Sequence, residues 1–431
     1  MRGGGRPRMP ARFGWLVSAQ FASALGDNAL LIVVIALLAQ QGLPIWWAPL
    51  LRVGFTLSYV LLAPFVGPLS DAFAKGRVMT AMNLLKVLGV ALLLGGLHPV
   101  ASLAVVGLGA AAYAPAKYGL VTEIVTPSSL VAANGWIEVS VVCAALLGAG
   151  LGGLLVSPWV LASAAATALD ASIPTPSGVL TFSLLLVLLL YALSSALNLG
   201  VPTSGARYAP SAIQLRPLLS EFQRTNARLW RDAEGSLSLA ATTIFWGVGA
   251  TLQFAVLRWS QDALGLGLDR AAYLQGAVAV GVIAGAAAAG RWVPLRHARR
   301  MLGLGVVLGL LLPLLAQLDD VITAALLLSL VGAVGGVMIV PLNALLQHRG
   351  HVLLTAGRSV AVQGFNENLG VLGMLAVYAL CQAAQWPIRT TLTVFGMLVA
   401  AAIAALVLVE RRRAQRLRPR GGAAAMPERA H

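Results

Sequence analysis

Long apolar runs recur along the whole chain, and they constrain its fold more than any other feature. A helix needs about 20 predominantly apolar residues to cross the hydrocarbon core of a bilayer. We therefore predict an all-α integral membrane protein with twelve transmembrane helices in two six-helix bundles. They lie near residues 13–40, 48–70, 77–97, 101–122, 133–156, 179–200, 237–260, 271–293, 299–316, 321–345, 357–383 and 390–410.

The basic residues predict the orientation of these helices. Lys and Arg accumulate in the cytoplasmic loops of membrane proteins. Here they gather at the N-terminus, in the loop after the second run, in the central linker and in the C-terminal tail, and only Arg258, Arg270 and Arg389 fall on the opposite side. We therefore expect both termini in the cytoplasm. The net charge of +15 then reflects topology and attraction to membrane lipids, not binding of nucleic acid.

A polar linker divides the chain into two halves that resemble each other. We expect a basic N-terminus (1–12), a first bundle (13–200), a cytoplasmic linker (201–236), a second bundle (237–410) and a basic tail (411–431). The spacing from Gly109 to Pro115 matches that from Gly335 to Pro341, and Asn134 to Glu138 matches Gln363 to Glu367. Matches at corresponding helices indicate a parallel duplication, in which two bundles rock about a central site.

The first apolar run carries an acid, Asp27, near its middle, and Asn28 follows it. An ionised carboxylate at bilayer depth is costly, so such residues usually face a bundle interior or an aqueous cavity on a transport path. A polar side chain in a membrane helix can instead tie helices together. We assign Asp27 to a transport path, and both interpretations stay open for Asn28.

The loop after the second run, from Gly67 to Arg77, resembles the signature loop of the major facilitator superfamily. In that loop a glycine permits close helix approach, an acid caps a helix or pairs across the two bundles, and a Gly-Arg turn returns the chain. An acid at the rim can engage the positive end of a facing helix in one state and release it in another. We therefore predict a gating role for Gly67, Asp71, Lys75, Gly76 and Arg77. The equivalent stretch of the second half, residues 285–300, has no acid.

Nearly the whole chain is similar to the bacterial lysophospholipid transporter family within that superfamily. The segments that carry the resemblance are Ser23–Leu31, Ala63–Met79, Gly109–Gly119, Phe245–Leu252 and Val340–Gln347. The resemblance implies movement of lysophosphatidylethanolamine and lysophosphatidylglycerol across the inner membrane of Gram-negative bacteria, by alternating access, to a cytoplasmic acyltransferase that reacylates them. The acyltransferase is fused to the transporter in some relatives, and here we expect it to be a separate partner.

Further candidate residues lie well inside the predicted helices. Lys117 and Glu138 fall at about one depth and can pair. Asn343 and Glu367 occupy the mirrored positions, so the second half keeps the acid and lacks the cation. We interpret Lys117 as a phosphate contact, because a cation in a low-dielectric cavity attracts an anionic headgroup. Lys86 joins these candidates, and a purely structural ion pair is the alternative for the charged ones.

Two positions depart from the family pattern. The family carries a basic residue where this chain has Gln253 in the seventh helix, and an uncharged one where it has Arg52 in the second. Our hypothesis is that Arg52 balances Asp27 in place of the missing cation, since we expect the second and seventh helices to be neighbours. The segment 157–178 is longer than in the family, and we expect it to form an outer loop.

Other functional classes fit the sequence less well. A proton-coupled exporter of amphipathic drugs or metabolites is the alternative, with Asp27 as the protonation site. The glycines of 148–153 lack the proline that such antiporters carry in the fifth helix. The histidines lack the spacing of an acyltransferase motif, and no phosphate-binding loop follows a strand pattern. We therefore expect no enzyme activity, no cofactor and no metal site.

Overall fold

The computed structural model describes residues 9–43, 47–173, 175–206, 208 and 214–417, and within them it contains helices and no strand. The first half of the chain forms six long helices. They are α1 (Phe13–Gln40), α2 (Trp47–Ala72), α3 (Lys75–Leu94), α4 (Pro99–Ile124), α5 (Leu130–Leu155) and α8 (Thr181–Asn198).

The second half repeats this arrangement after the linker. Its helices are α10 (Ala233–Leu264), α11 (Leu268–Trp292), α12 (Leu304–Ala316), which the 3-10 segment η3 (Leu295–Gly303) precedes, α13 (Val321–Leu353), α14 (Ala356–Ala383) and α15 (Ile388–Leu417). Within the described residues, eleven helical stretches are long and apolar enough to cross a membrane. The remaining long helix, α14, is less apolar because Gln363, Asn366, Glu367 and Asn368 lie in it.

Local sequence signals explain several helix boundaries. Asp232 caps α10 by accepting a hydrogen bond from the Gly235 amide at 2.8 Å, and Asp320 caps α13 in the same way. Gly265 ends α10 with a left-handed backbone (φ +61°), which glycine adopts without strain. The repeated prolines, Pro115 and Pro341, both lie inside long helices, α4 and α13. Internal prolines are tolerated where neighbouring helices satisfy the freed backbone groups.

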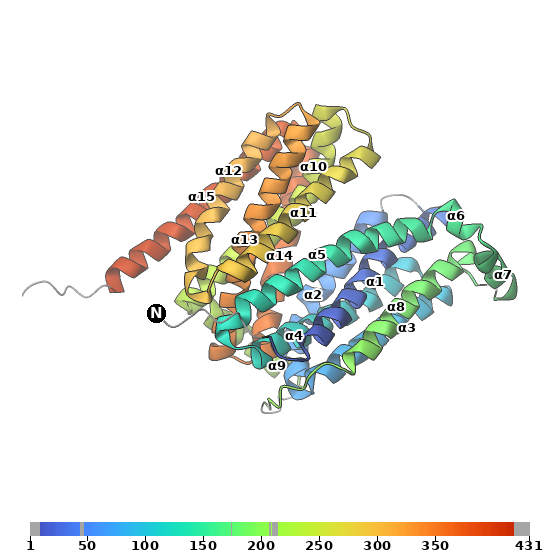
Figure 1. Cartoon of the computed structure of the whole chain (residues 1–431), viewed down its shortest axis with the longest axis horizontal. Coiled ribbons are helices and arrows are strands. Elements are labelled where there is room, and N and C mark those ends of the chain that lie inside the picture. The colour runs from blue at the N-terminus through green and yellow to red at the C-terminus, as the bar shows by residue number, and fades with distance from the viewer. Residues whose placement is uncertain (1–8, 44–46, 174, 207, 209–213, 418–431) are drawn as a thin grey trace, which may run out of the picture.

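The helices form two bundles that meet at one end (Figure 1). The bundles converge near α9 (Leu215–Arg231), the helix of the linker, and spread apart toward the short helices α6 and α7. At the joined end α2 packs against α14, and α5 packs against α11. A shared apolar cluster there combines Val131 and Ile137 of the first half with Ala286 and Val340 of the second. This end of the molecule is therefore closed.

Two glycines allow the halves to approach this closely. A Cβ on Gly67 of α2 would lie 2.9 Å from the Arg358 Cα of α14, and a Cβ on Gly135 of α5 would lie 3.1 Å from the Gly290 Cα of α11. Real Cβ atoms essentially never come within 3.0 Å of another heavy atom. Any side chain at Gly67 therefore pushes α2 away from α14.

We expect Gly67→Ala to destabilise the closed end by about 1–3 kcal/mol, the usual cost of overpacking a close contact. The midpoint temperature of unfolding in detergent measures the effect. Gly150→Ala is the matched control, because nothing lies within 4 Å of a Cβ at Gly150. An equal fall of the midpoint temperature in the two variants would contradict the role of Gly67 where α2 meets α14.

Two connections differ from the sequence-based expectation. The segment 157–178, expected to be a loop, contains the short helices α6 (Pro158–Leu161) and α7 (Ala164–Ser172), capped by Ser157 and Ser163. The linker contains the amphipathic helix α9, and α10 begins at Ala233, earlier than expected. Short helices with serine caps and a helix rich in arginine have low hydropathy, so a search for apolar runs passes over them.

Candidate functional site

Asp27 of α1 and Lys86 of α3 form an ion pair inside the first bundle. The Lys86 ammonium donates to both carboxylate oxygens of Asp27 at 2.8 Å and to the Ser23 hydroxyl at 2.9 Å. The side chain of Lys86 is 2% exposed and that of Asp27 is 20% exposed. Tyr191 of α8 donates its hydroxyl proton to the same carboxylate at 2.8 Å. Each charge is therefore neutralised within the bundle.

A chain of hydrogen bonds extends this ion pair across α1, α3 and α8. Ser23 donates to Asn83 at 3.0 Å, Asn83 donates to Ser194 at 2.6 Å, and Ser194 donates to the Ala19 carbonyl at 2.7 Å. Asn83 and Ser194 are fully buried. A satisfied buried network of this kind rigidifies the packing around it. Asn83 and Ser194 are not among the residues predicted from the sequence, although a polar residue within an apolar run is a usable signal.

Lys117 of α4 has a different environment from Lys86. Its ammonium donates to the Gln20 side-chain carbonyl at 3.0 Å, Gln20 donates to Ser140 at 2.9 Å, and the Tyr118 ring centroid lies 4.2 Å from the Lys117 Nζ. The charge of Glu138 acts on Lys117, but no ion pair joins them in the described part of the chain. An ammonium has three donors. Within the described residues, Lys117 thus keeps unused hydrogen-bond donors and forms no salt bridge.

Polar residues of both halves meet near Lys117. In the second half, the Gln363 amide donates to Glu367 at 2.8 Å and to Asn343 at 3.0 Å. Glu138 of α5, 5% exposed, has no hydrogen bond or ion-pair partner among the described side chains. The charges of Glu138 and Glu367 act on each other across the two halves. The duplication therefore brings its matched polar positions to one place between the bundles.

Two other predicted residues, Asn28 and Gln253, lie apart from this cluster. Asn28 donates to the Ala24 carbonyl of its own helix at 2.8 Å, and Gln253 is exposed, with its backbone carbonyl accepting from Gln275 at 2.7 Å. The side chain of Arg52 lies outside the described residues, so its coupling to Asp27 stays a hypothesis. The partner that the structure gives to Asp27 is Lys86.

Asn134 and Gln347 join the two halves through a reciprocal pair of hydrogen bonds. Asn134 of α5 donates to Gln347 of α13 at 2.9 Å, and Gln347 donates back at 3.0 Å. Both side chains are buried. The repeat marks Asn134 but does not predict this contact, because spacing along the chain does not reveal a partner 213 residues away.

Asp71 of α2 caps the start of α14 across the closed end. Its carboxylate accepts a hydrogen bond from the Gly357 amide at 2.9 Å and another from the Thr355 hydroxyl. The first amide groups of a helix lack partners within it, and the helix dipole favours an anion there. The structure thus places Asp71 at the positive end of a facing helix, the position on which the predicted gating role depends.

Lys75 connects Asp71 to a second acid. Its ammonium lies 3.8 Å from Asp71 and 2.6 Å from Glu123 of α4, and it lies 5.1 Å from the ring centroid of Tyr208. The Tyr208 hydroxyl donates to Glu123 at 2.7 Å. Burial raises the pKa of Tyr208, and the hydrogen bond to Glu123 adds to the effect, so the phenol stays a donor at neutral pH. Arg77 is exposed and lies outside this cluster.

We expect Asp71→Ala to open the closed end more often, because alanine removes the side-chain oxygen that caps α14. Loss of a helix cap costs about 0.5–2 kcal/mol, which corresponds to a rise of about 2- to 30-fold in the open population. Labelling of Ala132→Cys by a water-soluble maleimide reports the opening, because Ala132 packs on Gly290 across the halves. The background has Cys143 and Cys381 replaced by serine. Asp262→Ala, at an exposed ion pair, is the control, and equal labelling rates in both variants would contradict the role of Asp71.

In the second half, the acids that form ion pairs at this end lie outside the segment 285–300. Arg299 of η3 forms ion pairs with Glu234 at the start of α10 and with Glu410 of α15, the latter at 2.9 Å. Arg349 of α13 pairs with Asp232 at 2.6 Å. A charge network thus exists at this end of the second bundle, and it is assembled from different helices than in the first.

Comparison with known proteins identifies the class of this fold. The model of the Major Facilitator Superfamily matches residues 16–370. Among solved structures, the transporter FucP in the outward conformation has a TM-score of 0.71 at 17% identity, covering 94% of this chain and 98% of that protein. The human organic anion transporter MFSD10 has a TM-score of 0.70 at 15% identity, covering 92% and 100%. The fold is that of a major facilitator carrier.

Closer relatives narrow the class. The lysophospholipid transporters LplT of Citrobacter koseri, Shigella flexneri and Escherichia coli are each 40% identical to this chain over 399 residues, which cover 92% of the chain and 95% of each relative. The chain therefore belongs to the major facilitator superfamily and, within it, to the family of the lysophospholipid transporters LplT. It is a multi-pass membrane protein.

Proposed function

We propose that this protein carries lysophospholipids, including lysophosphatidylethanolamine and lysophosphatidylglycerol, by alternating access of its two bundles. The relatives named for this cargo support the proposal. The single observation of the site that carries it is the contrast between two buried lysines. Lys86 is neutralised by Asp27, whereas the one hydrogen-bond acceptor of Lys117 among the described residues is the neutral Gln20.

An ammonium that forms no salt bridge within the described residues suits the phosphate of a lysophospholipid. Charge-assisted hydrogen bonds from lysine to phosphate are roughly twice as strong as neutral ones. Glu138 lies within electrostatic range of Lys117 and is also without a partner in the described structure, which suits it to the ammonium of an ethanolamine headgroup. In this proposal the Asp27–Lys86 pair holds the helices that position Lys117, and Asp71 with Lys75 gates the closed end.

The proposal includes a membrane topology with twelve crossings. We count α14 as a membrane crossing as well, which brings the total to twelve. The helices α2, α4 and α10 pack around it and shield its polar residues from lipid. The distribution of the basic residues supports a cytoplasmic location for both termini and the linker, with the protein in the inner membrane of a bacterium. The closed end then faces the cytoplasm. A separate cytoplasmic acyltransferase would consume the cargo after it reaches the inner leaflet.

Uptake of labelled lysophosphatidylethanolamine by spheroplasts tests the function. Cells that lack their own lysophospholipid transporter should gain uptake when this chain is produced, and a Lys117→Gln variant should restore little of it. Unchanged uptake with the wild-type chain would contradict the proposal. Uptake or release that follows an imposed proton gradient, with drugs as cargo, would favour the alternative of a proton-coupled exporter.

A further inference from the structure

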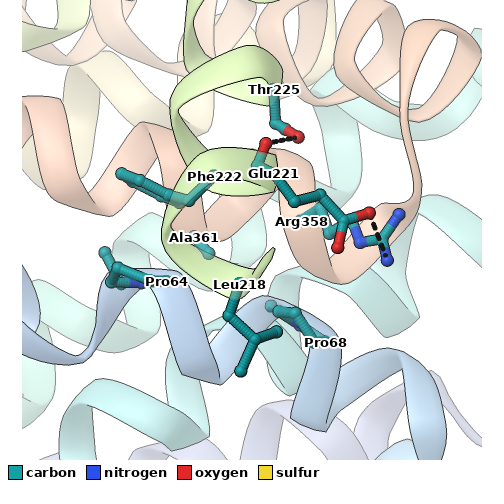
Figure 2. A pocket seen from close by; sticks show the side chains of 10 residues that line it. Pro64, Pro68, Leu218, Glu221, Phe222, Thr225, Arg358 and Ala361 are labelled. Carbon is teal, nitrogen blue, oxygen red and sulfur yellow. Dashed lines mark hydrogen bonds and ion pairs between the residues drawn. The ribbon is translucent and has the colours of Figure 1, made fainter. Parts of the chain in front are cut away.

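The linker helix α9 packs beside the crossing of α2 and α14. Leu218, Thr225 and Leu229 are its buried residues. The Phe222 ring lies 5.2 Å from the Phe365 ring of α14 in an edge-on arrangement, and Glu221 forms an ion pair with Arg358 at 2.9 Å. Figure 2 shows Phe222 above Pro64 of α2 and Leu218 between Pro64 and Pro68, with Glu221 directed toward Arg358.

The contacts of α9 place it beside α14 and not beyond the start of that helix. Asn366 of α14 donates to Asn226 at 2.9 Å and accepts from the Trp230 indole at 3.1 Å. Asn366 is ten residues past the start of α14 at Ala356, which is about 15 Å along the helix at 1.5 Å per residue. Helix α9 therefore lies alongside the first turns of α14 and does not extend beyond the end of that helix.

The exposed surface of α9 has an apolar part and a basic part. Leu215 is 58% exposed and Leu219 is 40% exposed. Arg216, Arg224 and Arg231 are exposed and share the face opposite the buried residues, at about 3.6 residues per turn. None of these three arginines has an ion-pair partner within the described residues, and the acid of this helix, Glu221, is occupied by Arg358.

We infer that α9 is an interfacial helix that binds the anionic phospholipid headgroups of the cytoplasmic leaflet. Leu215 and Leu219 enter the edge of the acyl region, and Arg216, Arg224 and Arg231 contact the phosphates. An amphipathic helix with arginines beside exposed leucines is typical of such binding, and basic groups near the surface are attracted to anionic lipids. Because the same helix packs on α2 and α14, bound lipid also keeps their crossing covered.

Spin-label accessibility in the full-length protein tests this inference. A nitroxide at Leu219→Cys, with Cys143 and Cys381 replaced by serine, is read in phosphatidylcholine vesicles with and without phosphatidylglycerol. We expect phosphatidylglycerol to raise the ratio of collisions with oxygen to collisions with a water-soluble nickel complex severalfold. The triple variant Arg216→Gln, Arg224→Gln, Arg231→Gln should lose that dependence. Inorganic phosphate added to phosphatidylcholine vesicles should not reproduce it.

A variant with equal charge loss elsewhere provides the control. Arg411→Gln, Arg412→Gln, Arg413→Gln removes three exposed arginines from α15 and should keep the response to phosphatidylglycerol. An accessibility ratio that is independent of phosphatidylglycerol, or a response that survives in the α9 variant or follows free phosphate, would overturn the inference. If Leu219→Cys perturbs the helix, the label at Leu215→Cys is read in the same way, with the same expected and contradicting outcomes.

Discussion

Lys86→Met is expected to destabilise the protein by about 3–5 kcal/mol, because removal of one member of a buried ion pair leaves the other charge uncompensated. Asp27 would keep only the Tyr191 hydrogen bond and its own charge. We expect a large fall of the midpoint temperature of unfolding in detergent, with loss of lysophospholipid uptake. The measurement is a thermal melt of the purified variant beside the wild type.

Two companion variants separate the ion pair from general damage. The exchange Asp27→Lys with Lys86→Asp restores opposite charges in the same place and should recover part of the lost stability. Arg258→Met removes one member of the exposed pair with Asp262, and exposed pairs contribute about 0–1 kcal/mol. If Lys86→Met melts at the wild-type temperature, the ion pair does not hold the first bundle together.

Lys117→Gln is expected to lower uptake of lysophosphatidylethanolamine and lysophosphatidylglycerol by at least about tenfold each. Hydrogen bonds to charged groups contribute about 1.5–3 kcal/mol, and 1.4 kcal/mol corresponds to about tenfold. Glu138→Gln should reduce uptake of the ethanolamine lipid more than that of the glycerol lipid, because only the first carries an ammonium. Initial rates for both lipids in spheroplasts measure the two effects.

Conservative changes at the same positions serve as controls for this selectivity. Lys117→Arg keeps the cation and should retain more uptake than Lys117→Gln, and Glu138→Asp should retain more preference for the ethanolamine lipid than Glu138→Gln. Equal loss of both lipids in Glu138→Gln would contradict an ammonium contact for Glu138 and leave it a structural role between the halves.

The sequence predicted the helices well because length and apolarity alone decide whether a segment crosses a bilayer. It predicted the polar positions of the site for the same reason, since Asp27, Lys86 and Lys117 stand out within apolar runs. It did not reveal their pairing. The partner of Asp27 depends on which face of α3 meets α1, and the apolar residues of both helices are spread around their circumference, so apolar periodicity does not mark the contact face.

The linker shows the opposite case. Its arginines indicate topology, but Leu218, Phe222 and Leu229 recur among them at helical spacing, which is a usable signal for α9. The contacts of Asp71 with Gly357 and of Asn134 with Gln347 join residues more than 200 positions apart. Such contacts follow from how the two bundles meet, which local sequence does not specify.

The most direct test of the account is the affinity of the purified protein for two ligands that differ only in the headgroup. Lysophosphatidylethanolamine and a monoacylglycerol with the same acyl chain are compared in the wild type and in Lys117→Gln. The account predicts that the wild type prefers the phospholipid and that Lys117→Gln loses at least about tenfold of this preference. An equal preference in both proteins would contradict a phosphate contact at Lys117.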